Sequence, residues 1–250
     1  MSPRLEFALQ VAYEAGRSTL SLFDTNHEVA IKSDGSPVTQ ADKEAEALIR
    51  KAIAEKYPGE AILGEEEGGH ESSQAKWVVD PIDGTKSFIC GVPLFATLIS
   101  YEEDGVPIIG VSYFPALDQM VFAERNQGAY FNGRPCRVST QGDVHKAVLC
   151  CGSHSSMEKY EKAAGFLRLA RRSLATRTWG DAYGHMLVAT GRVEAMLDPV
   201  VRRWDISAMQ VIVEEAGGKF TGFNGAHNPS TEAVSSNGLL HETVLDAFLQ

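Results

Sequence analysis

Two carboxylates three positions apart, at the end of an apolar run, are the residues of this chain whose types and spacing most clearly predict chemistry. Trp77 to Val79 lead into Asp80 and Asp83, and Gly84 and Thr85 follow directly. Buried carboxylates are costly unless a cation pairs with them, and a Gly-Thr turn into a helix offers backbone N–H groups to an anion. Hard cations and a phosphate could therefore meet here, as metal-assisted phosphate ester hydrolysis requires. The alternative is an ordinary turn, because Asp-Pro and Asp-Gly are common turn dipeptides.

Two further carboxylates lie where such a site could use them. Glu65 is the first residue of an acidic run that follows an expected strand over residues 61–64, and Asp205 follows Trp204 at the expected start of a helix. Each has an ordinary alternative, since acidic runs are usually solvated and an Asp at a helix start usually caps it. If these strand and helix ends meet, their oxygen ligands would suit Mg²⁺.

Thr85 and Asp42 form a second candidate pair. Thr39 and Asp42 have the spacing of a capping box, which explains Asp42 as part of a helix start. In the functional alternative, the Thr85 hydroxyl orients a water at the metal site and Asp42 accepts a proton from Thr85.

Composition excludes several classes of function. The 250 residues are 44% hydrophobic, enough for one large core or two lobes, and the net charge of −10 argues against a nucleic-acid partner. The four cysteines form no C-x-x-C pair, and neither a signal peptide nor a run of about 18 apolar residues occurs. We therefore expect a cytoplasmic protein with reduced thiols and no membrane partner. The chain also lacks a Walker A loop, a G-x-G-x-x-G motif and a G-x-S-x-G nucleophile elbow.

The hydrophobic periodicity predicts an N-terminal lobe over residues 1–145 and a C-terminal lobe over residues 146–250, layered as α/β. The first lobe begins with two helices and continues with β runs. The second alternates strands and helices, with the site between the lobes. We expect helices over residues 2–24, 39–57, 157–170, 182–189 and 206–216. We expect a loop over residues 26–37, and strands over residues 61–64, 76–79, 129–131, 136–138, 146–151, 174–178 and 193–197.

Taken together, the motifs resemble those of the inositol monophosphatase family, a family of Mg²⁺-dependent phosphatases. The resemblance covers nearly the whole chain. It rests on Gly64-Glu65-Glu66, Asp80-Pro81-Ile82-Asp83-Gly84-Thr85, Trp204-Asp205-Ile206-Ser207-Ala208 and Glu215-Ala216-Gly217-Gly218. It implies a layered αβαβα sandwich of the inositol monophosphatase and fructose-1,6-bisphosphatase type, a homodimer, and attack of an activated water on phosphorus without a phosphoenzyme.

The resemblance also implies a role for each matching position. Thr85 and Asp42 would activate the water together with Glu65, and Gly84 and Thr85 would offer backbone N–H groups to the phosphate. Lys32 would lie in a loop that closes over the metals. The metal ligands would be Glu65, Asp80, the carbonyl oxygen of Ile82, Asp83 and Asp205. The substrate contacts would be Asp83, Asp181, Asp198 and Asp205.

The substrate is the finer question. Gly180-Asp181-Ala182 and Asp198-Pro199 look similar to histidinol-phosphate phosphatases of this family, and either carboxylate could pair with the ammonium group of L-histidinol phosphate. We therefore expect a histidinol phosphatase of histidine biosynthesis, with inositol-1-monophosphatase as the alternative. Asp181 could instead cap the helix that begins at Ala182. Arg202 and Arg203 favour a different substrate, such as a nucleotide with a second anionic group. A binding protein that has lost catalysis is a further alternative, although every expected metal ligand is present.

Overall fold

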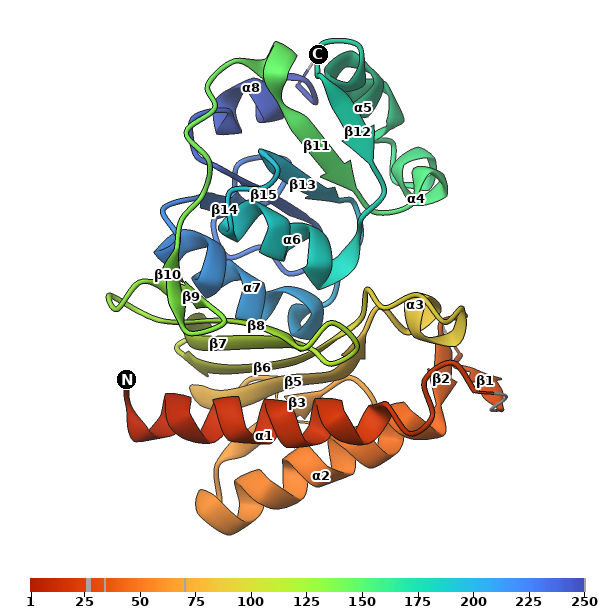
Figure 1. The fold of residues 1–250 in the computed structure, drawn as a ribbon, viewed down its shortest axis with the longest axis vertical. Helices are drawn as coiled ribbons and strands as arrows, with labels where there is room; N and C mark the ends of the chain where they lie inside the picture. The colour runs from red at the N-terminus through yellow and green to blue at the C-terminus, as the bar shows by residue number, and fades with distance from the viewer. Residues whose placement is uncertain (26–27, 34, 70, 250) are drawn as a thin grey trace.

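Five alternating layers of helices and sheets make up the fold (Figure 1). The structure, a computed structural model, describes residues 1–25, 28–33, 35–69 and 71–249. From one outer face to the other, the layers are a helix pair, an eight-stranded sheet, a second helix pair, a five-stranded sheet and a group of short helices. This order confirms the expected αβαβα sandwich. The division into lobes at residue 145 stays a prediction.

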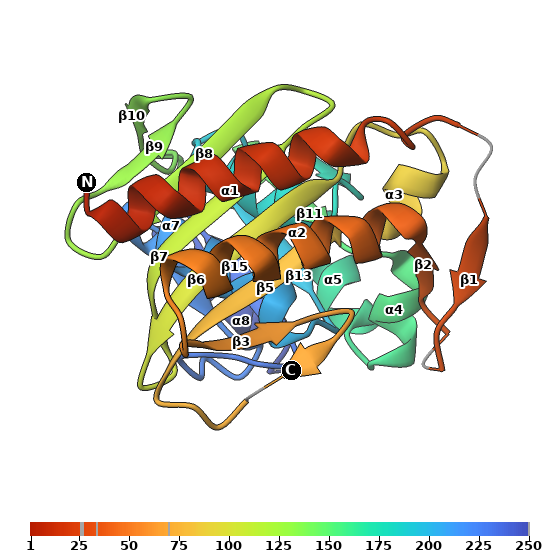
Figure 2. The same ribbon diagram turned by 90° about the horizontal axis from the view of Figure 1, so that it is seen from below.

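The first layer consists of α1 (Pro3–Thr19) and α2 (Gln40–Lys56), which lie side by side across the large sheet (Figure 2). The predicted capping box at the start of α2 is confirmed, because the Asp42 carboxylate accepts the Thr39 N–H while the Thr39 hydroxyl accepts a backbone N–H of the first turn. The predicted helix over residues 2–24 is too long, since residues 20–24 form turns.

The second layer is the sheet that carries the Asp80 motif. β5 (Ala75–Asp83) runs parallel to β3 (Ala61–Gly64) and antiparallel to β6 (Ala96–Glu103). β5 continues four residues beyond its predicted end, and its register with β6 shifts between Asp80 and Asp83. The strand order is β10–β9–β8–β7–β6–β5–β3–β4. The other strands are β4 (Gly68–Gly69), β7 (Val106–Phe114), β8 (Gln119–Glu124), β9 (Ala129–Phe131) and β10 (Arg134–Cys136).

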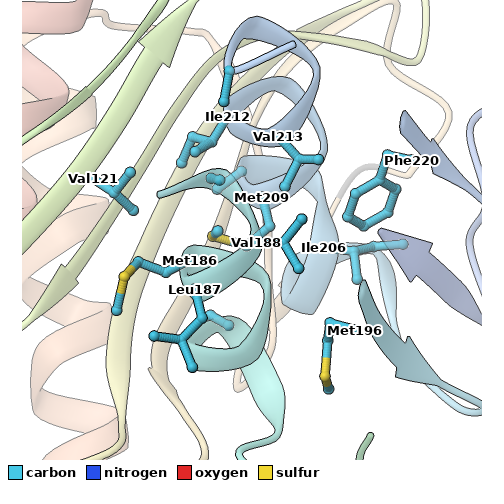
Figure 3. Packing of buried hydrophobic residues seen from close by; sticks show 14 of the residues in the cluster. Val121, Met186, Leu187, Val188, Met196, Ile206, Met209, Ile212, Val213 and Phe220 are labelled. Atoms are coloured by element: carbon cyan, nitrogen blue, oxygen red, sulfur yellow. The ribbon is translucent and has the colours of Figure 1, made fainter. Parts of the chain in front are cut away.

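The third layer consists of α6 (Asp181–Ala189) and α7 (Arg203–Glu215), which are enclosed between the two sheets. Because both faces of these helices pack against protein, apolar residues surround them rather than form one stripe. Figure 3 shows this core, in which side chains of both helices meet Val121 of the large sheet and Phe220 of the small one. The labelled helical residues are Met186, Leu187, Val188, Ile206, Met209, Ile212 and Val213.

The small sheet and the outer helices complete the sandwich. The sheet has the order β12–β11–β13–β15–β14. Its strands are β11 (Val148–Cys151), β12 (Ala175–Arg177), β13 (Ala195–Asp198), β14 (Lys219–Thr221) and β15 (Ala233–Ser236). The outer helices are α4 (His154–Lys159), α5 (Ala163–Ala170) and α8 (His241–Asp246). A short 3₁₀ helix, η1 (Val144–Lys146), leads into this sheet.

Three further predicted elements differ from the structure. The helix predicted over residues 157–170 is two helices, because Glu161 between them has a φ of 59°, a left-handed value that interrupts helical hydrogen bonding. The loop predicted over residues 26–37 contains β1 (Val29–Ile31), which pairs with β2 (Pro37–Thr39); residues 26, 27 and 34 lie outside the described part. The strand predicted over residues 136–138 is β10, which begins two residues earlier, directly after the turn at Asn132 and Gly133.

Candidate active site

Three carboxylates from distant parts of the chain converge at the end of β5. One oxygen each of Asp80, Asp83 and Asp205 lies within 4.8 Å of the other two. Asp80 and Asp83 come from β5, and Asp205 comes from the first turn of α7, which packs against that strand. Asp80 and Asp83 are buried and Asp205 is half-buried. The structure therefore brings together three of the predicted ligands.

The charges of this cluster call for a cation. Burial, together with repulsion from Glu65, Asp83 and Asp205, raises the pKa of Asp80 well above its usual value. Burial, with repulsion from Asp181 and Asp205, does the same to the pKa of Asp83. Burial and the surrounding carboxylates raise the pKa of Asp205 to about 8, although a hydrogen bond from the Arg202 backbone opposes this. A bound cation would oppose these raised pKa values and favour the ionised carboxylates, and three carboxylate oxygens fit a hard divalent metal ion.

Each carboxylate is held in place by a backbone N–H group. Asp80 Oδ1 accepts the Ile82 N–H at 3.1 Å, and Asp83 Oδ2 accepts the Ala182 N–H at 2.7 Å. Asp205 Oδ2 accepts the Arg202 N–H at 2.7 Å. Asp205 is the third residue of α7 rather than its N-cap, and it caps the helix through Oδ2.

Glu65 approaches the cluster because β3 and β5 are parallel neighbours. Gly64 pairs with Val79 in their register, which brings the next residues, Glu65 and Asp80, to the same edge of the sheet. The Glu65 carboxylate is bound to Lys32, whose Nζ lies 2.7 Å from Glu65 Oε1 and 2.7 Å from Glu66 Oε1. Burial would lower the pKa of Lys32, but its hydrogen bonds to both carboxylates raise it above its usual value.

The loop that carries Glu65 is held by Glu46, a residue that the sequence reasoning missed. Glu46 is fully buried on α2, and its carboxylate accepts the N–H groups of Glu66 at 2.8 Å and Glu67 at 3.0 Å. Arg50, one turn further along α2, bonds to Glu46 at 2.8 Å. Helical spacing from Asp42 to Glu46 was the available signal, since it places both on the buried face of α2.

Thr85 lies between the cluster and Asp42. Its Oγ1 donates to the Ile82 carbonyl oxygen at 3.1 Å and lies 3.4 Å from Asp42 Oδ1. The other oxygen of Asp42 accepts from the Thr39 N–H at 2.7 Å and the Thr39 hydroxyl at 2.6 Å. The structure thus brings the predicted pair together, and Asp42 caps α2 while it faces Thr85. Thr85 also begins α3 (Thr85–Ile89).

Asp181 and Asp198 face a pocket of about 560 Å³ beside the cluster. Asp181 is an exposed residue that lines this pocket. Its carboxyl group is nevertheless largely surrounded by protein atoms. Burial and the nearby Asp198 raise the pKa of Asp181 to about 6, while Lys86 acts in the opposite direction. Gly180 is the N-cap of α6 and has no side chain to cap it, while the Asp83 carboxylate accepts the Ala182 N–H of the first turn, so the alternative of Asp181 as a cap is wrong. Asp181 has a φ of 56°, a left-handed value that costs energy and often marks functional sites.

The arginine pair before Trp204 divides into one structural and one exposed residue. The Arg203 guanidinium binds the buried Glu102 carboxylate and donates to Gln210 and to the carbonyl oxygens of Pro229 and Gly105. Those four bonds occupy four of the five N–H donors of the guanidinium group, which makes Arg203 a poor partner for an anionic substrate group. Arg202 is exposed. Among the described residues, no helix is long and apolar enough to cross a membrane.

A five-layered fold with buried carboxylates at one strand end defines a class, the metal-dependent phosphoric monoester hydrolases. The chain belongs to the inositol monophosphatase family, which it matches over residues 1–250.

Relatives and solved structures agree with this placement. The chain is 38% identical to a histidinol-phosphatase of Chlorobaculum parvum, covering 99% of this chain and 97% of that protein. It is 39% identical to a histidinol-phosphatase of Mycobacterium tuberculosis, covering 96% of each. Its fold is similar to that of an IMPase of Thermotoga maritima, with a TM-score of 0.91 and 32% identity over 99% of this chain and 97% of the other.

Proposed function

We propose that the protein is a Mg²⁺-dependent phosphatase that hydrolyses L-histidinol phosphate to L-histidinol and phosphate. The observation that carries the proposal is the pair Asp181 and Asp198 in the pocket beside the cation site. Two acidic side chains there suit an alcohol portion that bears an ammonium group. The names of the relatives from Chlorobaculum parvum and Mycobacterium tuberculosis support the same substrate.

The proposed cation ligands are the five groups that the family resemblance implies. When bound there, Mg²⁺ would supply positive charge to the phosphate and lower the pKa of the attacking water. Its ligands would be Glu65, Asp80, the carbonyl oxygen of Ile82, Asp83 and Asp205. Lys32, between β1 and β2, forms an ion pair with the Glu65 carboxylate at 2.7 Å.

The residues around the cluster would position the water and the phosphate. Thr85 Oγ1 would orient the water and take up a proton from it while the Thr85 hydroxyl proton passes to Asp42, whose Oδ1 lies 3.4 Å away. The pKa of Asp42, raised by burial, makes this carboxylate a better proton acceptor than an exposed aspartate. The backbone N–H groups of Gly84 and Thr85 would bind the phosphate. Gly84 has a φ of 83°, which a glycine adopts without strain.

The test is phosphate release from a panel of esters, with Mg²⁺ or with EDTA. The panel contains L-histidinol phosphate, inositol 1-phosphate, glycerol 2-phosphate and AMP. We expect release that requires Mg²⁺ and is greatest from L-histidinol phosphate. Asp205→Asn should be inactive, and this result would exclude a contaminating phosphatase as the source of the released phosphate. Asp104→Asn, at an exposed position, should retain activity. Release that persists in EDTA would contradict the metal requirement.

Inositol 1-phosphate is the second candidate substrate. An inositol-1-monophosphatase of Mesorhizobium japonicum is 34% identical to the chain, covering 98% of this chain and 96% of that protein. A preference for inositol 1-phosphate in the panel would favour this candidate.

A homodimer is the proposed assembly. β12 is the edge strand of the small sheet, and the flanking Leu174 and Trp179 are 66% and 40% exposed. An open strand edge beside apolar side chains favours association. Light scattering should give twice the chain mass of 27.1 kDa, and a monomeric mass would contradict the proposal.

A further inference from the structure

A buried histidine lies directly behind the acidic pocket. His185 is on α6, is 1% exposed, and has its Nδ1 2.7 Å from the hydroxyl oxygen of Ser235. Its Nε2 is buried and has no hydrogen-bond partner in the described part of the chain. Asp198 Oδ2 lies 3.5 Å from Nε2, a distance that is too long for a good hydrogen bond. A buried nitrogen without a partner is costly and calls for an explanation.

Ser235 determines which nitrogen of His185 carries the proton. Ser235 is fully buried, and His185 Nδ1 is its one side-chain hydrogen-bond partner among the described residues. A buried hydroxyl needs an acceptor for its proton, and the unprotonated Nδ1 supplies one. The neutral imidazole then carries its proton on Nε2. His185 therefore points an N–H group at the Asp198 carboxylate.

The space between these two groups is polar and large enough for water. A small pocket of about 40 Å³ is lined by His185 and Asp198 together with Asp83, Asp181 and Asp205. A water molecule needs roughly 10–15 Å³ of such space and two or more polar partners. The Nε2–H group can thus reach Asp198 through one water or after a small rotation of either side chain.

The two oxygens of Asp198 face different spaces. Oδ2 faces His185. Oδ1 faces Gly152, where even a methyl side chain would come within 2.5 Å of it. Gly152 lines the larger pocket together with Asp181 and Asp198. An anchor on Oδ2 would therefore fix the direction in which Oδ1 meets the bound alcohol.

We propose that His185 is a positioning residue that anchors Asp198 through Nε2–H and so sets the affinity for an ammonium-bearing alcohol. The inference rests on the proposed function, because it requires such an alcohol in the larger pocket. Asp198 is the residue that contacts the substrate, and His185 acts through it. Ser235 completes the arrangement by fixing the tautomer of His185.

The test uses steady-state kinetics to compare two variants of His185 that carry an amide side chain. His185→Gln can place an N–H group near the position of Nε2, whereas His185→Asn can reach only the position of Nδ1. His185→Leu removes both groups. For the Asn and Leu variants, we expect the KM for L-histidinol phosphate to rise about tenfold more than the KM for glycerol 2-phosphate. A difference of this size corresponds to the loss of one hydrogen bond to a charged group. The Gln variant should restore most of this selectivity.

A double-mutant cycle with Asp198→Asn supplies a readout that a purely structural role would not give. In the Asp198→Asn background, His185→Asn should cause no further loss of selectivity. The exposed His145→Asn is the matched control. Equal KM changes for both substrates, additive losses in the cycle, or equal behaviour of the Gln and Asn variants would each overturn the inference. If the unmodified enzyme hydrolyses no ammonium-bearing ester, the proposed function is wrong and the inference falls with it.

Discussion

Asp83 and Ala182 lie 99 positions apart, yet Asp83 Oδ2 accepts the Ala182 backbone N–H at 2.7 Å. This bond joins the strand end that carries the proposed cation ligands to the helix that carries Asp181. The proposed phosphate site and the proposed alcohol pocket are therefore linked through the Asp83 carboxylate. Its second oxygen remains available to the cation cluster.

Replacing Asp83 by asparagine should separate its two roles. The amide oxygen can still accept the Ala182 N–H, so the fold should persist, but the lost charge should weaken divalent cation binding by at least about tenfold. Titration with Mn²⁺, followed by electron paramagnetic resonance, measures this affinity. The exposed Asp104→Asn is the control, and its left-handed φ of 50° suits asparagine. Unchanged Mn²⁺ affinity in Asp83→Asn would remove Asp83 from the ligand set.

The Thr85 hydroxyl should affect turnover more than binding. Thr85→Val keeps the shape but removes the group that bonds to Ile82 and faces Asp42. We expect kcat to fall about 10²–10⁴-fold with a small change in KM, and Thr85→Ser to retain most activity. Equal kcat values for the valine and serine variants would show that the hydroxyl takes no part in the reaction.

The metal-free protein should lose stability as the pH rises. Burial and neighbouring carboxylates raise the pKa of Asp205 to about 8, above its usual value in an unfolded chain. A group of this kind contributes stability at pH values below its unfolded pKa, and that contribution is lost as the pH rises through the folded pKa. The melting temperature in EDTA should therefore fall between pH 5 and pH 9. Mg²⁺ or the Asp205→Asn substitution should flatten this dependence, and a steeper fall with Mg²⁺ would refute the explanation.

Asp181→Asn should change stability and activity in opposite directions. Burial and Asp198 raise the pKa of Asp181 to about 6, so at pH 8 its charge destabilises the folded protein. The variant should melt at a higher temperature than the unmodified protein at pH 8 in EDTA, with a smaller difference at pH 5. Its kcat/KM should fall more for L-histidinol phosphate than for glycerol 2-phosphate. Parallel losses for both esters would mean that Asp181 does not recognise the ammonium group.

The parts of the site that lie close together in the sequence could be predicted from it. Asp80, Asp83 and Thr85 lie within six positions on one strand end and the turn that follows, so their spacing already places them together. The capping box of Thr39 and Asp42 is local in the same way. Glu65 could be placed near Asp80 because two expected strands ended in acidic residues.

Contacts between distant segments could not be predicted in this way. The contacts of Lys32 with Glu65, of Glu66 with Glu46 and of Ser235 with His185 depend on how the layers pack, which hydrophobic spacing does not encode. The break between α4 and α5 was missed because Glu161 adopts a left-handed φ, and no glycine or proline marks that position. Arg203 looked available for an anion because Glu102, its partner, lies about a hundred positions away.

The most direct measurement of the central claim is the ratio of kcat/KM for L-histidinol phosphate to that for inositol 1-phosphate, at saturating Mg²⁺ and neutral pH. If Asp181 and Asp198 recognise the ammonium group, the ratio should be at least about ten, because one hydrogen bond to a charged group contributes that much to selectivity. A ratio of one or below would contradict the proposed substrate.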